Sequence, residues 1–258
     1  MEFPRPLIPG QLERRYKRFL ADVRLDGGEV VTAHCPNPGS MMGLADPGMR
    51  VWLSPSISPK RKLKYTWELV ACNGAGELAG INTAHPNLLA AEAIADGRIT
   101  ELAGYESMRR EVRYGANSRV DILLEGHGGR CLVEVKNVHL SRAPGLAEFP
   151  DSVTARGAKH LDELAKRVAE GDRAVMLYIV QRPADRFALA ADIDPAYAAA
   201  FARARAQGVE ALCYVCDIGL HGISVGKAID LTHDVTEARA ASGTRPAARA
   251  EPERQPTG

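Results

Sequence analysis

The chain has 258 residues, of which 45% are hydrophobic and 25% charged, and its formal net charge is +1. Its length and composition suit one large or two small globular domains, and the net charge alone gives no reason to expect an anionic partner. The sequence has no run of about 18 apolar residues and no apolar signal-peptide segment near Met1, so we expect neither a membrane span nor secretion. Five scattered cysteines, an odd number, favour a reduced, cytoplasmic protein.

Residues 1–80 predict a small β-barrel. Strand-like runs over 19–25, 30–34, 50–53 and 67–72 alternate with turns rich in Gly, Pro, Asn and Asp. Closing such short strands on themselves removes their exposed edges, so a barrel of about five strands is expected.

Two clusters of cations and aromatic residues lie in this predicted barrel. Cations can follow phosphates and aromatic rings can stack on bases, so both clusters are candidates for DNA binding. Either cluster alone is better explained as a solvated strand end or loop. The candidates are Arg14, Arg15, Tyr16, Lys17 and Arg18 in the first cluster, and Lys60, Arg61, Lys62, Lys64, Tyr65 and Trp67 in the second.

Residues 81–238 predict a second domain of a different kind. A helix over 88–95 precedes three strands over 108–114, 119–125 and 131–138, and an amphipathic helix over 158–170 follows. The continuous apolar run 174–180 suits a buried strand reached by a βαβ crossover. A helix over 195–207 and a strand over 211–215 come next. The polar segment 239–258 is expected to be disordered.

The hairpin over 119–138 carries acidic residues in apolar strands. If Glu125 and Arg130 close its Gly-rich turn, Asp121 lies opposite Glu134, and opposed side chains share a face. Lys136 lies two residues beyond Glu134 and so points to the same face. Two adjacent carboxylates repel each other, and a divalent cation such as Mg²⁺ or Mn²⁺ would relieve that repulsion.

This pattern is weak as a bare motif, because Glu-x-Lys on a strand usually marks a solvated face. The apolar run after Asp121 and the order of the surrounding elements favour a site. That order resembles the restriction-endonuclease-like core, whose motif is written PD-(D/E)xK, with Val120 in place of the usual proline. By the same resemblance, Glu92 is expected to be a further acid of the site, and Gln181 the polar residue after the last core strand.

Longer phrases of the chain resemble the sugar fermentation stimulation protein A (SfsA) family, over about residues 5–235. The phrases are Thr32–Met41, Asn117–Asp121, Val133–Val138, Phe149–Gly157 and Asp192–Pro195. The resemblance implies an N-terminal OB-fold and a C-terminal nuclease-like domain, hence an α+β two-domain protein. It also implies DNA binding without sequence preference and a role in regulating sugar (maltose) metabolism.

Three functions follow as alternatives. We expect a nonspecific DNA-binding protein with a nuclease-like site; the alternative is an active Mg²⁺-dependent endonuclease. In the latter, Asp121 and Glu134 hold the metal, helped by the Val135 carbonyl and by Glu92 through water, while Lys136 orients the attacking water or stabilises the transition state. A sequence-specific transcription factor ranks last, because no helix-turn-helix with a basic recognition helix is found.

A cysteine pair and a histidine are further candidates for chemistry. The pair Cys213 and Cys216 lacks a second pair of ligands, so no zinc is expected. His160 is equally consistent with facing the carboxylates or with lying on the surface. The oligomeric state is left open, a homodimer included.

Overall fold

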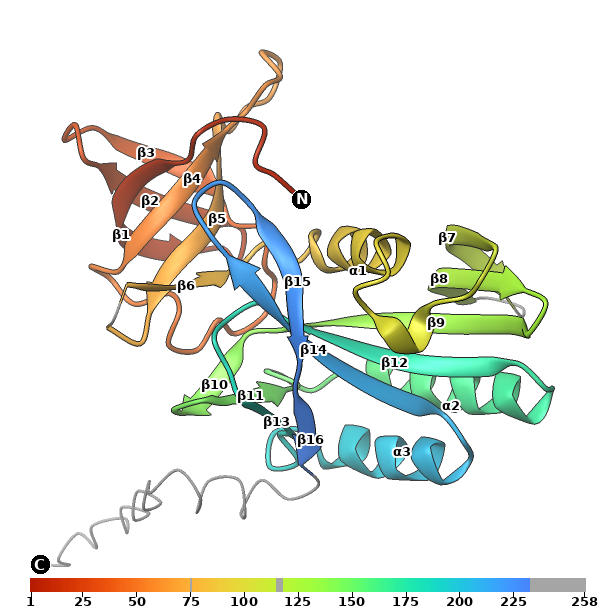
Figure 1. The fold of residues 1–258 in the computed structure, drawn as a ribbon. Coiled ribbons are helices and arrows are strands. Elements are labelled where there is room, and N and C mark those ends of the chain that lie inside the picture. Colours follow the sequence, from red (N-terminus) through yellow and green to blue (C-terminus); the bar gives the residue numbers. More distant parts are fainter. Residues whose placement is uncertain (75, 115–117, 233–258) are drawn as a thin grey trace, which may run out of the picture.

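The computed structural model describes residues 1–74, 76–114 and 118–232, so the tail 239–258 lies outside the described residues. An N-terminal barrel is followed by a C-terminal α/β domain, and the two lie against each other (Figure 1). This is the two-domain architecture that the sequence predicts.

The barrel consists of six strands, the first five of which close on themselves. Its sheet has the order β3-β2-β1-β4-β5-β6, and a parallel pairing of His34 with Thr66 joins β3 to β5. The prediction of a closed five-stranded OB-fold is therefore confirmed. The strands are β1 (Ile8–Tyr16), β2 (Leu20–Leu25), β3 (Val30–His34), β4 (Arg50–Pro55), β5 (Tyr65–Cys72) and β6 (Glu77–Gly80).

Trp67 lies at the centre of the barrel core. Its side chain is fully buried, and the indole Nε1 donates a hydrogen bond of 2.9 Å to the Leu69 carbonyl. The expectation that Trp67 stacks on DNA bases is wrong. The neighbouring cations suggested a surface position, but most of β5 is buried on both faces, and the large apolar ring fills the barrel interior.

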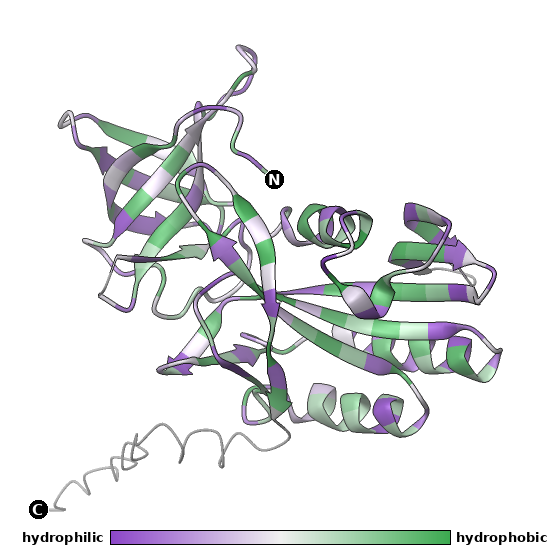
Figure 2. Cartoon of the chain, in the orientation of Figure 1, coloured by the Kyte–Doolittle hydropathy of each residue, from purple (hydrophilic) through white to green (hydrophobic). Residues whose placement is uncertain are grey.

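The C-terminal domain is built around a six-stranded sheet of order β15-β14-β12-β9-β8-β7. Helix α1 packs against β8, β9 and β15, and α2 packs against β12 and against α3. Strand β12 is almost entirely hydrophobic, in keeping with burial on both faces (Figure 2), and β9 is buried over its middle part, 131–135. The elements are α1 (Pro86–Ala95), β7 (Ser107–Tyr114), β8 (Ser118–Gly126), β9 (Gly129–Val138), α2 (Ala155–Ala169), β12 (Arg173–Val180), α3 (Pro195–Ala206), β14 (Glu210–Ile218) and β15 (Ile223–Ala228).

Three features of the C-terminal half were not predicted, one of which is the edge strand β15 of the main sheet. A second sheet consists of β10 (Leu140–Ala143), β11 (Leu146–Phe149), β13 (Arg186–Leu189) and β16 (Asp230–Thr232), and a 3₁₀ turn spans Thr100–Leu102. The first residues, assigned to the barrel within 1–80, instead contact the C-terminal domain: Phe3 donates its backbone N–H to the His221 carbonyl at 2.9 Å. None of the described helices is long and apolar enough to cross a membrane.

Candidate functional site

The β8–β9 hairpin has the predicted register. Five residue pairs, from Gly126 with Gly129 to Ile122 with Val133, follow the expected count. The ladder then stops one pair short of Asp121 and Glu134. Val120 and Ile122 would share a face of the sheet in a regular strand. Here Val120 packs in the core on the α2 side, and Ile122 packs in the core on the α1 side. Asp121 thus lies where the backbone turns from one face to the other.

The Asp121 carboxylate occupies the gap left by the ended ladder. Its Oδ2 accepts the Val135 backbone N–H at 2.8 Å, and its Oδ1 accepts a hydrogen bond of 2.8 Å from Asn87 Nδ2 on α1. Burial, and after it the charge of the neighbouring Glu134, raise the pKa of Asp121 above the ordinary value for aspartate. The two acids are therefore neighbours, as predicted, although they are not a regular cross-strand pair.

Glu134 and Lys136 form a buried ion pair on the α2 side. Lys136 Nζ lies 2.7 Å from Glu134 Oε1, and the two side chains are 14% and 4% exposed. His160 Nδ1 also contacts Glu134 Oε1, so His160 faces the site and is not a surface residue. Arg156 donates from Nε to His160 Nε2 at 3.2 Å, which assigns the ring proton to Nδ1, toward Glu134.

The surroundings of Glu134 favour its ionised form. Burial alone would raise the pKa of Glu134, but the hydrogen bond from His160 and the charge of Lys136 outweigh it and hold the pKa below the usual value. The site therefore contains one carboxylate stabilised as an anion and a second, Asp121, whose charge is opposed by burial and by its neighbour.

Glu92 does not join this cluster. It lies on α1 but contacts the Met1 amino group at 2.7 Å and Arg98 at 3.7 Å. The α1 residue that reaches Asp121 is Asn87, five positions earlier and so more than a third of a turn away around the helix. The prediction that Glu92 is a further acid of the site is therefore wrong.

Sequence reasoning also missed Glu111. This residue of β7 has a positive φ of 54°, and its Oε1 lies 3.4 Å from Asn87 Nδ2, so Asn87 bridges Glu111 and Asp121. The change of face at Asp121 is matched by this irregularity in the neighbouring strand. Nothing in the local sequence around Asn87 or Glu111 signals either contact.

The donor set suits a hard divalent cation with much of its own water. The described residues contain no group of three or more His, Cys, Asp or Glu that could hold a metal ion. Asp121 and Glu134 nevertheless supply carboxylate oxygens, and Mg²⁺ commonly binds through one or two carboxylates while keeping several waters. Burial and the charge of Glu134, which together raise the pKa of Asp121, are effects that a cation bound there would oppose.

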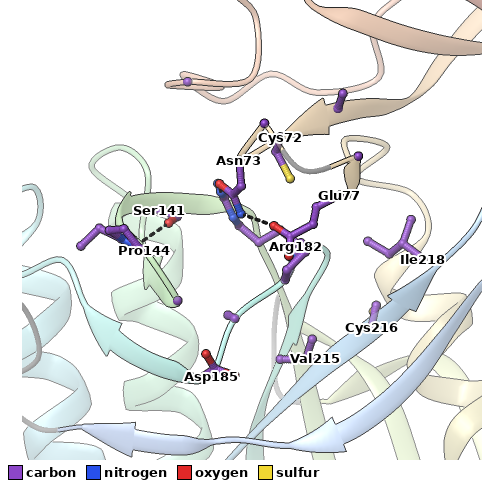
Figure 3. A pocket seen from close by; sticks show the side chains of 18 of the residues that line it. Cys72, Asn73, Glu77, Ser141, Pro144, Arg182, Asp185, Val215, Cys216 and Ile218 are labelled. Atoms are coloured by element: carbon purple, nitrogen blue, oxygen red, sulfur yellow. Dashed lines mark hydrogen bonds between the residues drawn. The ribbon is translucent and has the colours of Figure 1, made fainter. Parts of the chain in front are cut away.

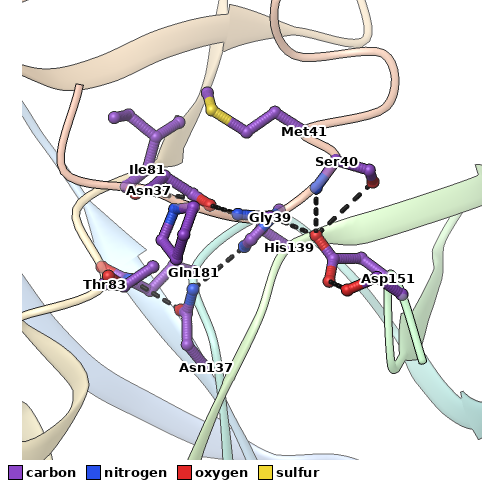
Figure 4. A network of polar contacts seen from close by, with 12 residues as sticks. Asn37, Gly39, Ser40, Met41, Ile81, Thr83, Asn137, His139, Asp151 and Gln181 are labelled. Carbon is purple, nitrogen blue, oxygen red and sulfur yellow. Dashed lines mark hydrogen bonds and ion pairs between the residues drawn. The ribbon is translucent and has the colours of Figure 1, made fainter. Parts of the chain in front are cut away.

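A polar network joins the barrel to the strand that carries Glu134 and Lys136 (Figure 4). Ser40 donates its backbone N–H to Asp151 Oδ2 at 3.0 Å, and a Cβ on Gly39 would clash with the same carboxylate. In the same network, Gln181 Nε2 donates a hydrogen bond of 2.8 Å to Oδ1 of Asn137, the residue that follows Lys136. The barrel loop 37–40 is thereby fixed against the C-terminal domain.

Asp151 also faces His139. The Asn137 amide lies 2.9 Å from His139 Nδ1, which leaves Nε2 directed toward Asp151 Oδ2 at 3.4 Å, without hydrogen-bond geometry. Burial would raise the pKa of Asp151, but His139, the Ser152 hydroxyl and the Ser40 N–H outweigh it and hold the pKa below the usual aspartate value.

The stability contributed by Asp151 is expected to depend on acid pH. Because its folded pKa is depressed, this contribution is complete above the ordinary pKa of about 3.9 and is lost as the pH falls through the lower folded value. Asp151→Asn should lower the free energy of unfolding by roughly 1.5–3 kcal/mol at neutral pH. Urea unfolding measured from pH 7 downward should show the variant and the wild type converging in acid; a constant gap, or an equal loss in the control Asp46→Asn, would contradict this.

A cleft of about 1140 Å³ lies between the barrel and the C-terminal domain, away from the carboxylates. It is lined by Cys72, Asn73 and Glu77 from the barrel and by residues 141–145, 182–185 and 215–218 (Figure 3). Arg182, buried at its wall, donates to Asn73 Oδ1 at 3.1 Å and to the His139 carbonyl at 3.0 Å. None of Asp121, Glu134 and Lys136 lines this cleft.

The cationic clusters of the barrel lie in and beside two loops: Arg14, Arg15 and Tyr16 end β1, and Tyr65 and Trp67 belong to β5. Lys17 and Arg18 form the exposed turn between β1 and β2, whereas Arg15 points inward and donates to the carbonyls of Asn37 and Gly39 at 2.9 Å. Arg14 pairs with Asp22 at 2.8 Å and lies over the ring of Tyr16, whose hydroxyl also contacts Asp22. The residues Lys60, Lys62 and Lys64 are exposed between β4 and β5, and Arg61 and Tyr65 are half-buried.

Strand pairing brings these two loops to one end of the barrel. Leu20, just after the first turn, pairs with His34, and His34 pairs with Thr66, just after the second loop. Arg61 Nη2 lies 3.3 Å from His34 Nδ1. Exposed cations from two distant segments therefore converge across β3.

Comparison with protein families gives matches to both halves of the chain. The family model described as "SfsA N-terminal OB domain" matches residues 14–81, and the one described as "Sugar fermentation stimulation protein RE domain" matches residues 84–222.

Whole-length relatives agree with these matches. A sugar fermentation stimulation protein homolog of Paramagnetospirillum magneticum is 57% identical over 239 residues, which cover 92% of this chain and 99% of that protein. The homolog of Azorhizobium caulinodans is 60% identical over 229 residues, 87% of this chain and 97% of that one. Among solved structures, "The structure of Pyrococcus Furiosus SfsA in complex with Ca2+" matches with a TM-score of 0.80 and 28% identity, covering 90% of this chain and 98% of that one.

Proposed function

Because the chain belongs to the sugar fermentation stimulation protein family, whose two domain models match its two halves, we propose that it binds DNA without sequence preference and holds a divalent cation at Asp121 and Glu134. The observation that carries this proposal is the meeting of Asp121, Glu134 and Lys136 at the end of the β8–β9 ladder. Regulation of sugar use, which the family name implies, would act through this DNA binding.

The barrel supports the choice of DNA as partner. OB-folds contact oligonucleotides with the loops between strands 1 and 2 and between strands 4 and 5, which are the two loops that carry the exposed cations here. Phe19, 45% exposed, lies beside the first loop and offers a ring for base stacking in place of Trp67. Contacts of this kind read the phosphate backbone and the base faces, so they give little sequence preference.

The carboxylate site supports the choice of a hard cation. Carboxylate oxygens are preferred ligands of Mg²⁺, Mn²⁺ and Ca²⁺, and the similar Pyrococcus furiosus protein is described as a Ca²⁺ complex. A bound Mg²⁺ or Mn²⁺ would lower the pKa of a coordinated water and neutralise charge on a phosphate. The chain's own part is to fix the ligands: Asn87 and the Val135 N–H orient Asp121, and His160 and Lys136 orient Glu134.

DNA binding is tested by measuring affinity against salt. The slope of log affinity against log salt should be steep, about 0.9 per phosphate contact, and nearly the same for unrelated duplex sequences. The variant Lys17→Gln/Lys62→Gln removes one exposed cation from each loop and should lower the slope by about 2. The control Lys159→Gln/Lys227→Gln removes two exposed cations of the C-terminal domain. A flat salt titration of the wild type would rule out this mode of binding.

Hydrolysis of DNA is the second candidate function. The observation that favours it is Lys136, whose ammonium group is held beside Glu134 although a purely structural cation site has no need of a third, positive group. In a hydrolytic site, this group would stabilise the additional negative charge of the transition state.

A further inference from the structure

The hairpin of β7 and β8 carries two arginines that face each other, and no anionic partner for either lies within residues 1–74, 76–114 and 118–232. Arg113 and Arg119 are a direct cross-strand pair, both exposed. Opposed residues have Cβ atoms about 5 Å apart, and like charges at that spacing destabilise the pair. Among the residues that the structure describes, neither guanidinium has a hydrogen bond or an ion pair, whereas Arg109 on the same strand pairs with Glu125 at 2.7 Å.

The pair lies close to the carboxylate site. Arg119 precedes Asp121 by two residues on β8, a distance of roughly 7 Å along the strand. Val112 and Val120, the adjacent cross-strand pair, pack in the core on the α2 side, so the two arginines project from the opposite face. That is the face from which Asn87 of α1 reaches Asp121.

Protection of an edge strand does not account for this arrangement. Strand β7 lies at the edge of the sheet, where charged side chains discourage pairing with another chain. Charges of either sign serve that purpose, and an arginine opposite an acid would do so without repulsion. An anion between two facing arginines would relieve their repulsion.

We propose that Arg113 and Arg119 together bind a backbone phosphate of the DNA strand that passes Asp121. This inference rests on the proposed function, and it adds a contact on the C-terminal domain to those of the barrel. Guanidinium groups suit this role because their planar donors match the oxygens of a phosphate. The phosphate would lie within one or two nucleotides of Asp121, since the charges of one strand recur every 3.4 Å or so along a duplex axis.

The test compares Arg113→Gln/Arg119→Gln with the control Lys166→Gln/Arg203→Gln, which removes two exposed cations from α2 and α3. In fluorescence anisotropy with a short duplex, the arginine variant should weaken binding and lower the salt slope by one to two phosphate contacts, about 0.9–1.8, while the control keeps the wild-type slope. The unfolding midpoint of the arginine variant should equal or exceed that of the wild type, because a repulsive pair has been removed. An unchanged slope in a folded arginine variant would overturn the inference and leave nonspecific DNA binding intact.

A second measurement separates failure of the pair from failure of DNA binding altogether. Tripolyphosphate should raise the unfolding midpoint of the wild type and of the control by more than that of the arginine variant. This result supports the pair even if the wild type binds no duplex. Equal increases in all three proteins would count against it.

Discussion

Replacing Glu134 by glutamine is expected to lower the free energy of unfolding by about 3–5 kcal/mol, the usual cost of leaving one member of a buried ion pair without its partner. Lys136 is 14% exposed, and its ammonium group lies 2.7 Å from Glu134 Oε1. Relief of the repulsion between Glu134 and Asp121 opposes this loss. The contacts with His160 and Lys136 together outweigh this relief, because they hold the pKa of Glu134 below its usual value in spite of burial. Urea unfolding at neutral pH measures the change.

Two controls identify the ion pair as the cause. Adding Lys136→Met to the Glu134→Gln variant should recover most of the lost stability, since neither member of the ion pair is then left without its partner. Glu125→Gln breaks the exposed pair with Arg109 and should cost less than about 1 kcal/mol. If Glu134→Gln is as mild as Glu125→Gln, or if the double variant is no more stable than the single one, the pair does not stabilise the fold in this way.

The second large effect concerns chemistry at the site. If the chain hydrolyses DNA, Lys136→Ala should reduce nicking of supercoiled DNA by roughly 10²–10³-fold, as expected for the loss of one group that stabilises transition-state charge. The same variant should still bind Ca²⁺, because both carboxylates remain. Asp121→Ala should lose nicking and Ca²⁺ binding together. Nicking is measured with Mg²⁺ and with Mn²⁺, and Ca²⁺ binding from the shift in unfolding midpoint, at temperatures where each variant is folded.

Each outcome selects one function. Equal traces of cutting by the wild type and Lys136→Ala indicate a contaminating nuclease. Calcium binding that depends on Asp121, with no cutting in either metal, indicates a binding protein that has kept the ligands of a nuclease. Retention of Ca²⁺ binding in Asp121→Ala would remove the proposed cation from this site.

Much of the carboxylate site is predictable because it depends on local geometry. A Gly-rich turn sets the hairpin register, and the two-residue period of a strand then sets which side chains meet. These rules place Glu134 beside Lys136 correctly. They miss the end of the ladder at Ile122, because neither rule predicts the change of face at Asp121 or the positive φ of Glu111 in the neighbouring strand.

The wrong predictions for Trp67 and Glu92 concern side chains whose positions depend on tertiary packing. Trp67 follows a run of cations, yet the barrel interior buries it completely. Glu92 has the chemistry of a ligand, but the phase of α1 turns it toward Met1 and brings Asn87 to Asp121 instead. The helical period predicts which residues of α1 share a face. No local pattern predicts which of those faces contacts the sheet at Asp121, where the β8–β9 ladder ends.

The hydrogen bond between Ser40 of the barrel loop 37–40 and Asp151 fixes the spacing of the two domains for any nucleic acid held by both. The chain passes from β6 to α1 in only a few residues, and this joint is further fixed by Asn37, which donates to the Ile81 carbonyl at 3.0 Å. The distance between the two domains is thus fixed. The number of nucleotides between the barrel contacts and Asp121 is set by the fold and should be the same for every sequence bound.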